Sequence, residues 1–415
     1  MSGPELDVVL FGATGFVGAL TAAHLAEAAG DARVALAGRS EARLTELRAG
    51  LGPGARDWEL VAVDASDSDG LQRLAARTRV LASTVGPYAV LGREVVLAAA
   101  RQGTHYADLT GEASFLAWSL ATAAGPAAES GARIVHSCGF DSIPSDLGVW
   151  LIAEQASADG EGRLAQATLI VRSLRGGLSG GTIDSLRQEV IAAASNREVR
   201  QVLRDPYSAL PTGTPRPGAG RTVLSRRLRG LLPVERDSRT GRWLGPFVMA
   251  GYNTRIVRLS RALAGHPDPA GLPYRELSDV GAGPAGPVRA IGMGLGLAAV
   301  TAGLAWGPSR ALIDRVLPRP GEGPDADQRA AGHFRMEITA STSSGARYLA
   351  TVAADRDPGY NGTAVMLGQS ALSLATDGDA LPQRAGVLTP STALGGPLVE
   401  RLRGQGFTLA IERLD

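Results

Sequence analysis

Three glycines spaced three residues apart, Gly12, Gly15 and Gly18, follow a short apolar run that begins at Val8. A strand, a glycine turn and the start of a helix together form the local structure that binds the pyrophosphate of a dinucleotide. The first glycine permits the tight turn, the second lets the backbone approach the phosphates, and the third lets the helix pack on the strand. Because a helix N-terminus offers N–H groups and a partial positive charge to an anion, the spacing predicts a dinucleotide site.

The second predicted strand, residues 33–37, is followed by Arg39 and Ser40. An acidic residue near this position binds the ribose 2′-hydroxyl of NAD, whereas an arginine accommodates the 2′-phosphate of NADP. A planar guanidinium can bind that phosphate through two parallel hydrogen bonds. Asp64, after the third predicted strand, is placed where a carboxylate could meet the adenine edge. We therefore expect NADP(H), the alternative for Arg39 being a solvated side chain at a helix start.

A fourth predicted strand, residues 80–84, leads into a turn made of Val85, Gly86, Pro87 and Tyr88. If the sheet is doubly wound, this turn lies near the nicotinamide, because ligands of such sheets bind outside the carboxyl ends of the strands where the strand order reverses.

The 415 residues are enough for two domains, and the net charge of +1 comes from scattered residues. The sequence therefore shows no basic footprint for nucleic acid. The single cysteine, Cys138, excludes an internal disulfide and fits a reducing cytoplasmic location. No spacing of His, Asp or Glu indicates a metal site, and the first strand follows the N-terminus too soon for a secretory signal.

Every basic residue other than histidine is arginine, since the chain contains no lysine. This absence excludes Schiff-base chemistry on a lysine. It also excludes the Tyr-x-x-x-Lys pair with which short-chain dehydrogenases activate their tyrosine.

Alternating strand and helix patterns continue to a strand at residues 134–136, with one helix expected over 114–130. The pattern predicts an α/β fold with an N-terminal Rossmann domain, a doubly wound parallel sheet, over residues 1–145. Residues 146–375 are expected to form an α+β domain on a mixed sheet, and residues 376–415 to form helices and a strand that pack back on the core. The strands expected in the mixed sheet are residues 167–173, 333–340 and 347–353.

Residues 290–306 are apolar and uncharged, with Arg289 and Arg310 at the flanks. A membrane-spanning helix needs about 20 apolar residues, so the segment is marginal for a span. It could instead be a buried or capping helix of a soluble domain. It could also be a helix that lies on a membrane surface or lines a lipid-access channel.

Several motifs together resemble saccharopine dehydrogenase-like oxidoreductases, and most of all the trans-acting enoyl reductase family of actinobacterial lipid synthesis. The motifs are residues 12–18, 37–40, 85–88, 106–112, 138–146, 179–182 and 386–390. The resemblance implies an enzyme that works in trans with a polyketide synthase and reduces an α,β-unsaturated, lipid-like thioester. It also implies nucleotide contacts at Gly12, Thr14, Gly15, Phe16, Val17, Gly18, Arg39, Ser40 and Asp64.

Enoyl reduction requires a hydride at the β-carbon, a stabilised enolate oxygen and a proton for the α-carbon. Tyr88 is the first candidate for the donor, although its ring could merely pack against the cofactor. Asp141 and Ser142, after the sixth strand, could also face the substrate, or Asp141 could serve a helix start. Two other functions stay open: a saccharopine-reductase-like dehydrogenase of amino acids or imines, and a non-catalytic, lipid-associated NADP-binding protein.

Overall fold

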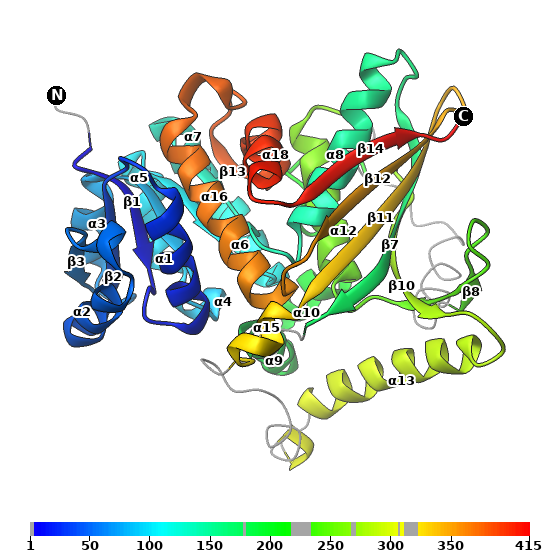
Figure 1. Ribbon diagram of the computed structural model, residues 1–415, viewed down its shortest axis with the longest axis horizontal. Coiled ribbons are helices and arrows are strands. Elements are labelled where there is room, and N and C mark those ends of the chain that lie inside the picture. The colour runs from blue at the N-terminus through cyan, green and yellow to red at the C-terminus, as the bar shows by residue number, and fades with distance from the viewer. Residues whose placement is uncertain (1–3, 177–179, 217–233, 267–270, 306–307, 311–322) are drawn as a thin grey trace.

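The computed structural model describes residues 4–176, 180–216, 234–266, 271–305, 308–310 and 323–415. Within these residues the chain forms two seven-stranded sheets with helices around and between them (Figure 1). Residue 179 of the motif at 179–182 and residue 306 of the apolar segment lie outside the described ranges.

The first sheet has the strand order β13-β6-β5-β4-β1-β2-β3, and all of its pairs are parallel. The order reverses between β1 and β4, so the predicted doubly wound sheet is confirmed, and its ligand site lies outside the carboxyl ends of these two strands. The strands are β1 (Leu6–Phe11), β2 (Val34–Gly38), β3 (Glu59–Ala62), β4 (Thr78–Ser83), β5 (His105–Asp108), β6 (Arg133–Val135) and β13 (Gly386–Leu388).

Two elements of this layer come from the far end of the chain. β13 extends the sheet beside β6, and α16 (Thr363–Thr376) packs against α1, β1, β4 and β5. Residues 363–375 are all buried, so α16 is a core helix of the dinucleotide-binding layer. The other helices of the layer are α1 (Phe16–Ala28), α2 (Glu41–Gly50), α3 (Ser68–Ala76), α4 (Tyr88–Leu91), α5 (Arg93–Gln102), α6 (Ala113–Thr122) and α7 (Ala124–Ser130).

The single helix expected over residues 114–130 is wrong, because the structure divides it into α6 and α7 at Ala123. Pro126 has no N–H to donate to the carbonyl of Thr122, the bond that a continuous helix would require.

The second sheet has the order β14-β12-β11-β7-β10-β9-β8. Only β7 and β10 pair in parallel, so the predicted mixed sheet is confirmed. Its strands are β7 (Leu164–Arg175), β8 (Glu235–Arg236), β9 (Trp243–Pro246), β10 (Tyr274–Gly281), β11 (His333–Thr342), β12 (Arg347–Ala354) and β14 (Thr408–Arg413).

α8 leads from the first sheet to the second and packs on β7, β11, β12 and β14, and α12 packs on α8 and β10. The remaining helices are α8 (Ile143–Ala158), α9 (Gly180–Ser195), α10 (Arg197–Arg204), α12 (Ala250–Leu263), α13 (Gly286–Ala305), α15 (Ala326–Ala330), α17 (Pro390–Ala393) and α18 (Gly395–Gly404). Short helical turns cover Pro53–Ala55, Pro358–Gly362 and Gly378–Ala380.

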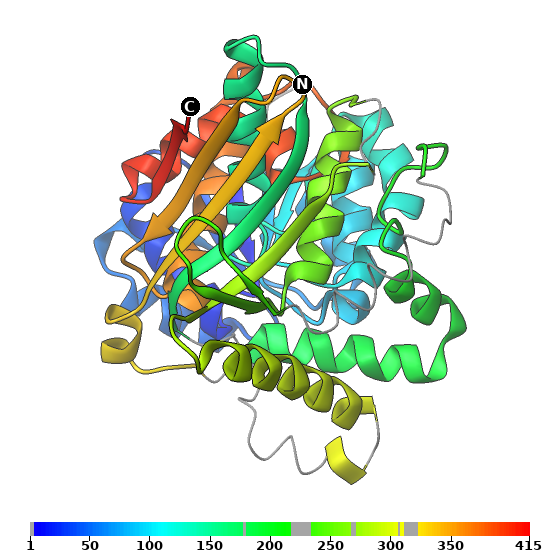
Figure 2. The same cartoon turned by 90° about the vertical axis from the view of Figure 1, so that its right-hand side faces the viewer.

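α13 contacts α9, β9 and β10 along one side and otherwise faces solvent, as Figure 2 shows beside α9. It is the one helix of the described chain long and apolar enough to cross a membrane, yet only 17% of its most apolar window is buried. Val288 is 71% exposed and Leu295 is 56% exposed. The exposure rules out the buried-helix interpretation of residues 290–305.

Candidate active site

The glycine turn between β1 and α1 has the geometry of a phosphate cradle. Gly12 has φ +85°, and a Cβ there would lie 2.5 Å from Cγ2 of Val85. A Cβ on Gly18 would lie 2.2 Å from the carbonyl oxygen of Gly12, so only glycine lets α1 pack on the turn. Gly15 precedes α1, and no side chain caps that helix N-terminus. The cradle therefore fits a dinucleotide pyrophosphate.

The other residues expected at this turn have structural contacts as well. The carbonyl of Thr14 accepts a 2.9 Å hydrogen bond from the Arg43 guanidinium, and the Phe16 ring meets Tyr360 edge-on at 5.0 Å. Val17 lines the cavity described below. Phe16 thereby connects the glycine turn to the segment that precedes α16.

Arg39 is strongly exposed after β2, with its Nε 3.9 Å from a carboxylate oxygen of Asp64. Ser40 caps α2 by accepting the N–H of Arg43. Hydrogen bonds from Ser66, with a smaller contribution from Arg39, hold the pKa of Asp64 below its usual value. Arg43 was missed by sequence reasoning, although its position one helical turn after Arg39 was a usable signal. Arg39 directly follows β2, and the Arg43 guanidinium contacts the glycine turn; in this fold an arginine near the end of β2 accommodates an adenosine 2′-phosphate.

The turn of residues 85–87 contains a cis bond between Gly86 and Pro87. The Glu112 carboxylate binds the backbone directly after this turn. It accepts the N–H of Tyr88 at 2.9 Å and the N–H of Ala89 at 2.7 Å. Ser185 of α9 donates a third hydrogen bond, at 2.6 Å. Burial raises the pKa of Glu112, and these three donors oppose that effect.

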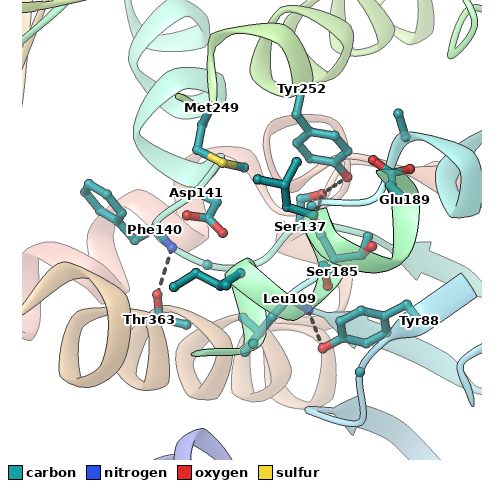
Figure 3. A pocket seen from close by; sticks show the side chains of 18 of the residues that line it. Tyr88, Leu109, Ser137, Phe140, Asp141, Ser185, Glu189, Met249, Tyr252 and Thr363 are labelled. Carbon is teal, nitrogen blue, oxygen red and sulfur yellow. Dashed lines mark hydrogen bonds between the residues drawn. The ribbon is translucent and has the colours of Figure 1, made fainter. Parts of the chain in front are cut away.

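A cavity of about 280 Å³ opens between this turn, the carboxyl ends of β5 and β6, and helices α9 and α12 (Figure 3). Most of the exposed surface of its wall is apolar, although many polar side chains also reach the cavity. The apolar lining includes Val17, Leu109, Phe140, Ile183, Leu186, Leu203, Val248 and Met249, and the polar lining includes Thr84, Tyr88, Ser137, Asp141, Ser185, Glu189, Tyr252 and Arg255. Among the described residues no group of three His, Cys, Asp or Glu side chains could hold a metal ion.

The structure brings Tyr88 and Asp141 to this cavity but places Ser142 behind its wall. The Tyr88 hydroxyl donates to the carbonyl of Ser83 at 3.1 Å and accepts the N–H of Leu109 at 3.2 Å. The Asp141 carboxylate lies beside Met249 and lines the cavity (Figure 3).

Ser142 is fully buried, and its hydroxyl donates to Oδ1 of Asn253 at 2.9 Å. Helix α8 begins directly after Ser142, at Ile143, because Pro144 suits a first helical turn. Ser142 therefore sits at the start of α8, where α12 covers it. The catalytic roles of Tyr88, Asp141 and Ser142 stay predictions.

The hydroxyl groups of Ser137 and Tyr252 also line the cavity, and neither residue was predicted from the sequence. The Ser137 hydroxyl donates to the carbonyl of Thr110 at 2.9 Å and lies 2.6 Å from the Tyr252 hydroxyl. Because Ser137 has only one hydroxyl proton, Tyr252 must be the donor in their shared bond. Ser137 has φ +66°, the one positive φ of a non-glycine residue in the described chain, a strain that concentrates at functional sites.

A buried network fixes Ser137 in this conformation. One oxygen of Asp108 accepts the Ser137 N–H at 3.0 Å, and the other lies 2.7 Å from Nδ1 of His136. Nε2 of His136 in turn lies 2.8 Å from the Ser119 hydroxyl. The neighbouring Cys138 is buried, which raises the pKa of its thiol and suppresses its reactivity. His136 and Cys138 are both fully buried, and neither lines the cavity.

Arg255 is the only basic side chain among the described residues that line the cavity. Its guanidinium donates to the Ser208 hydroxyl and to the carbonyls of Val202, Leu203, Asp205 and Gly251, at 2.6–3.3 Å. The guanidinium is thus saturated by the protein. Glu189 accepts the Ser114 N–H at 2.8 Å, and burial raises its pKa. Among the described residues, the cavity lining consequently offers apolar surface and acidic groups, and its one cationic side chain already donates to the protein.

Comparisons with known proteins agree with this geometry. Residues 8–135 match the saccharopine dehydrogenase NADP-binding domain, so the dinucleotide of the first sheet is NADP(H). Apo saccharopine dehydrogenase (L-Glu forming) of Saccharomyces cerevisiae shares the fold, with a TM-score of 0.55, 14% identity, and coverage of 98% of this chain and 99% of that one. Homospermidine synthase of Legionella pneumophila, solved with NAD, gives a TM-score of 0.52 at 9% identity and covers 99% and 92%. The protein is an oxidoreductase of the saccharopine dehydrogenase fold.

Relatives with established names identify the family within this class of oxidoreductases. The trans-acting enoyl reductase of Mycobacterium tuberculosis is 43% identical over 99% of this chain and 98% of its own length. The Mycobacterium ulcerans enzyme of the same name is 42% identical with the same coverage. Another Mycobacterium tuberculosis protein, which bears that name provisionally, is 45% identical and equally covered. This chain belongs to the trans-acting enoyl reductase family.

Replacement of Arg39 by alanine should weaken NADPH binding by about tenfold to a hundredfold, the equivalent of a hydrogen-bonded charge contact. NADH binding should stay unchanged, because NADH has no 2′-phosphate. Titration followed by nicotinamide fluorescence measures both affinities, with Arg73→Ala on the exposed side of α3 as the control. An equal loss for both dinucleotides would refute the 2′-phosphate assignment.

Proposed function

We propose that this protein reduces the carbon–carbon double bond of an α,β-unsaturated acyl thioester, using NADPH. The observation that carries the proposal is the apolar cavity at the carboxyl edge of the first sheet, whose one arginine is saturated by protein carbonyls. An uncharged acyl chain matches such a wall by hydrophobic burial. The names of the mycobacterial relatives support the same chemistry.

An amino-dicarboxylate or imino acid fits this cavity poorly. Such substrates require cationic partners for their carboxylates, and a buried unpaired carboxylate is costly. Arg255 is engaged, and the nearby Asp141 and Glu189 carboxyl groups would repel a second acid. We therefore do not favour amino-acid dehydrogenation, although the fold is shared with saccharopine dehydrogenase.

NADPH supplies the hydride when it is bound. The chain must then hold a donor that stabilises the enolate oxygen or protonates the α-carbon. We assign this donor to Tyr252, because its proton points to another cavity hydroxyl, that of Ser137, which the Asp108 network holds in place. The Tyr88 proton is directed to the backbone of β4, which suits a residue that fixes the nicotinamide turn.

The test of the proposal is reduction of a small 2-enoyl thioester of N-acetylcysteamine by the purified protein and NADPH. Loss of NADPH absorbance should accompany formation of the saturated thioester, identified by mass spectrometry. Mixtures of glutamate with an aldehyde, which form imines, are the comparison substrates. Turnover of the imine without turnover of the enoyl thioester would contradict the proposal, and turnover of neither would favour a non-catalytic protein.

The two tyrosines give a sharper test of the mechanism. Tyr252→Phe removes the proposed donor and should lower kcat roughly a hundredfold, a typical effect of losing a general acid, with NADPH affinity unchanged. Tyr88→Phe keeps the proposed donor and should retain kcat within a few fold. The reverse ranking, measured by steady-state kinetics and nicotinamide fluorescence, would restore Tyr88 as the donor.

We also propose that the enzyme is cytoplasmic and contacts a membrane through α13. This helix has no acidic residue, and the side chains of Val288, Ile291, Met293 and Leu295 are exposed. Arg289, near its N-terminal end, is the single charged residue in residues 286–305. An apolar helix face with basic flanks is typical of a helix lying at the lipid interface.

The double variant Ile291→Ser with Leu295→Ser should weaken membrane binding by about tenfold or more, because each lost side chain removes roughly 1.5–3 kcal/mol of burial. Flotation with vesicles of phosphatidylglycerol and phosphatidylethanolamine measures the bound fraction. Leu174→Ser is the control, since Leu174 of β7 and Ile291 are both 42% exposed. Unchanged flotation of the double variant would remove α13 from membrane contact.

A further inference from the structure

Helices α9 and α10 together form one wall of the cavity. Ile183, Leu186 and Glu189 of α9 and Leu203 of α10 line it, and α10 packs against both α9 and α6. Arg204, the residue after Leu203, is exposed. On this short helix, a residue that lines the cavity is therefore followed directly by a residue on the outer surface of the protein.

α10 carries three arginines on one face. Arg197, Arg200 and Arg204 recur at intervals of three and four residues, which places them on one side of a helix. Arg197 and Arg204 are exposed, and Arg200 is half-buried. Glu198 projects about 100° or more away from each of them, at about 100° per residue. We call these three arginines the α10 arginine face.

This concentration of charge does not follow from the composition, because the net charge of the whole chain is only +1. Like charges three and four residues apart destabilise a helix. Asn196 caps the N-terminus of α10 by accepting two backbone N–H groups, so these N–H groups already have a partner within the protein. A face that is unfavourable to the isolated helix points to an anionic partner.

Arg255 of α12 holds α10 in place beside the cavity. Its guanidinium donates to the carbonyls of Val202, Leu203 and Asp205, so the C-terminal end of α10 is held to α12. A partner bound to the α10 arginine face would therefore have a defined position relative to the cavity. It would not need to displace the wall.

We infer that the α10 arginine face docks an acidic carrier domain that presents the enoyl thioester on a flexible arm. This inference rests on the proposed function. A thioester delivered in trans must arrive on a separate protein, and charge complementarity guides such encounters and sets their orientation. We assign contact with a lipid surface to α13 instead, because the exposed side chains of α13 are apolar. The exposed side chains of the α10 arginine face are charged.

The test compares one acyl group on two carriers: an acidic acyl carrier domain and N-acetylcysteamine. The variant Arg197→Glu with Arg200→Glu should lower kcat/KM for the carrier-bound substrate by about tenfold or more. It should leave kcat/KM for the N-acetylcysteamine thioester unchanged. Arg197→Lys with Arg200→Lys keeps the charge and should behave as wild type. Arg73→Glu with Arg101→Glu makes the same charge change on α3 and α5, and should have no selective effect.

Added salt should likewise slow the wild-type enzyme on the carrier-bound substrate alone, because screening weakens exposed charge pairs. An equal loss on both substrates, or no loss on either, would overturn the docking assignment. The assignment would also be overturned if the Arg197→Glu with Arg200→Glu variant lost vesicle flotation without a kinetic effect. That result would show that the arginines bind an anionic membrane. Failure of wild type on the N-acetylcysteamine thioester would instead contradict the proposed function itself.

Discussion

The Glu112 carboxylate lies where the two halves of the site meet, and both depend on it. It is fully buried, and it receives the N–H groups of Tyr88 and Ala89 from the first layer and the Ser185 hydroxyl from α9. A buried charge costs several kcal/mol unless hydrogen bonds compensate it, and bonds to a charged group contribute about 1.5–3 kcal/mol each. Each of the three donors therefore stabilises the buried carboxylate. The nicotinamide turn and the cavity wall are thus held in one relative position.

The cofactor half of the site could be predicted because its determinants are local. Gly12, Gly15 and Gly18 lie within seven consecutive residues, and Arg39 follows the next strand directly. In each case the chemistry is set by backbone conformation and by the end of one strand, both of which leave a pattern in the sequence. Arg43 could have been added by the same argument, since it needs only the helix that Ser40 begins.

The substrate half could not be predicted, because tertiary contacts decide it. Tyr252 meets Ser137 from 115 residues away, and Arg255 is placed by carbonyls of another helix. Tyr88 lines the cavity, but the direction of its hydroxyl depends on its contacts with Ser83 and Leu109. β13 gave no detectable signal because a three-residue strand is too short for a periodic pattern.

The return of the chain to its first layer has a consequence for synthesis. α16 covers β1, β4 and β5, and β13 completes the sheet beside β6, yet both are made after the whole second sheet except β14. A nascent chain that ends before residue 363 exposes the apolar face that α16 covers. The dinucleotide-binding layer therefore cannot mature as an independent N-terminal unit on the ribosome. Completion of this layer therefore waits for the last fifty or so residues of the chain.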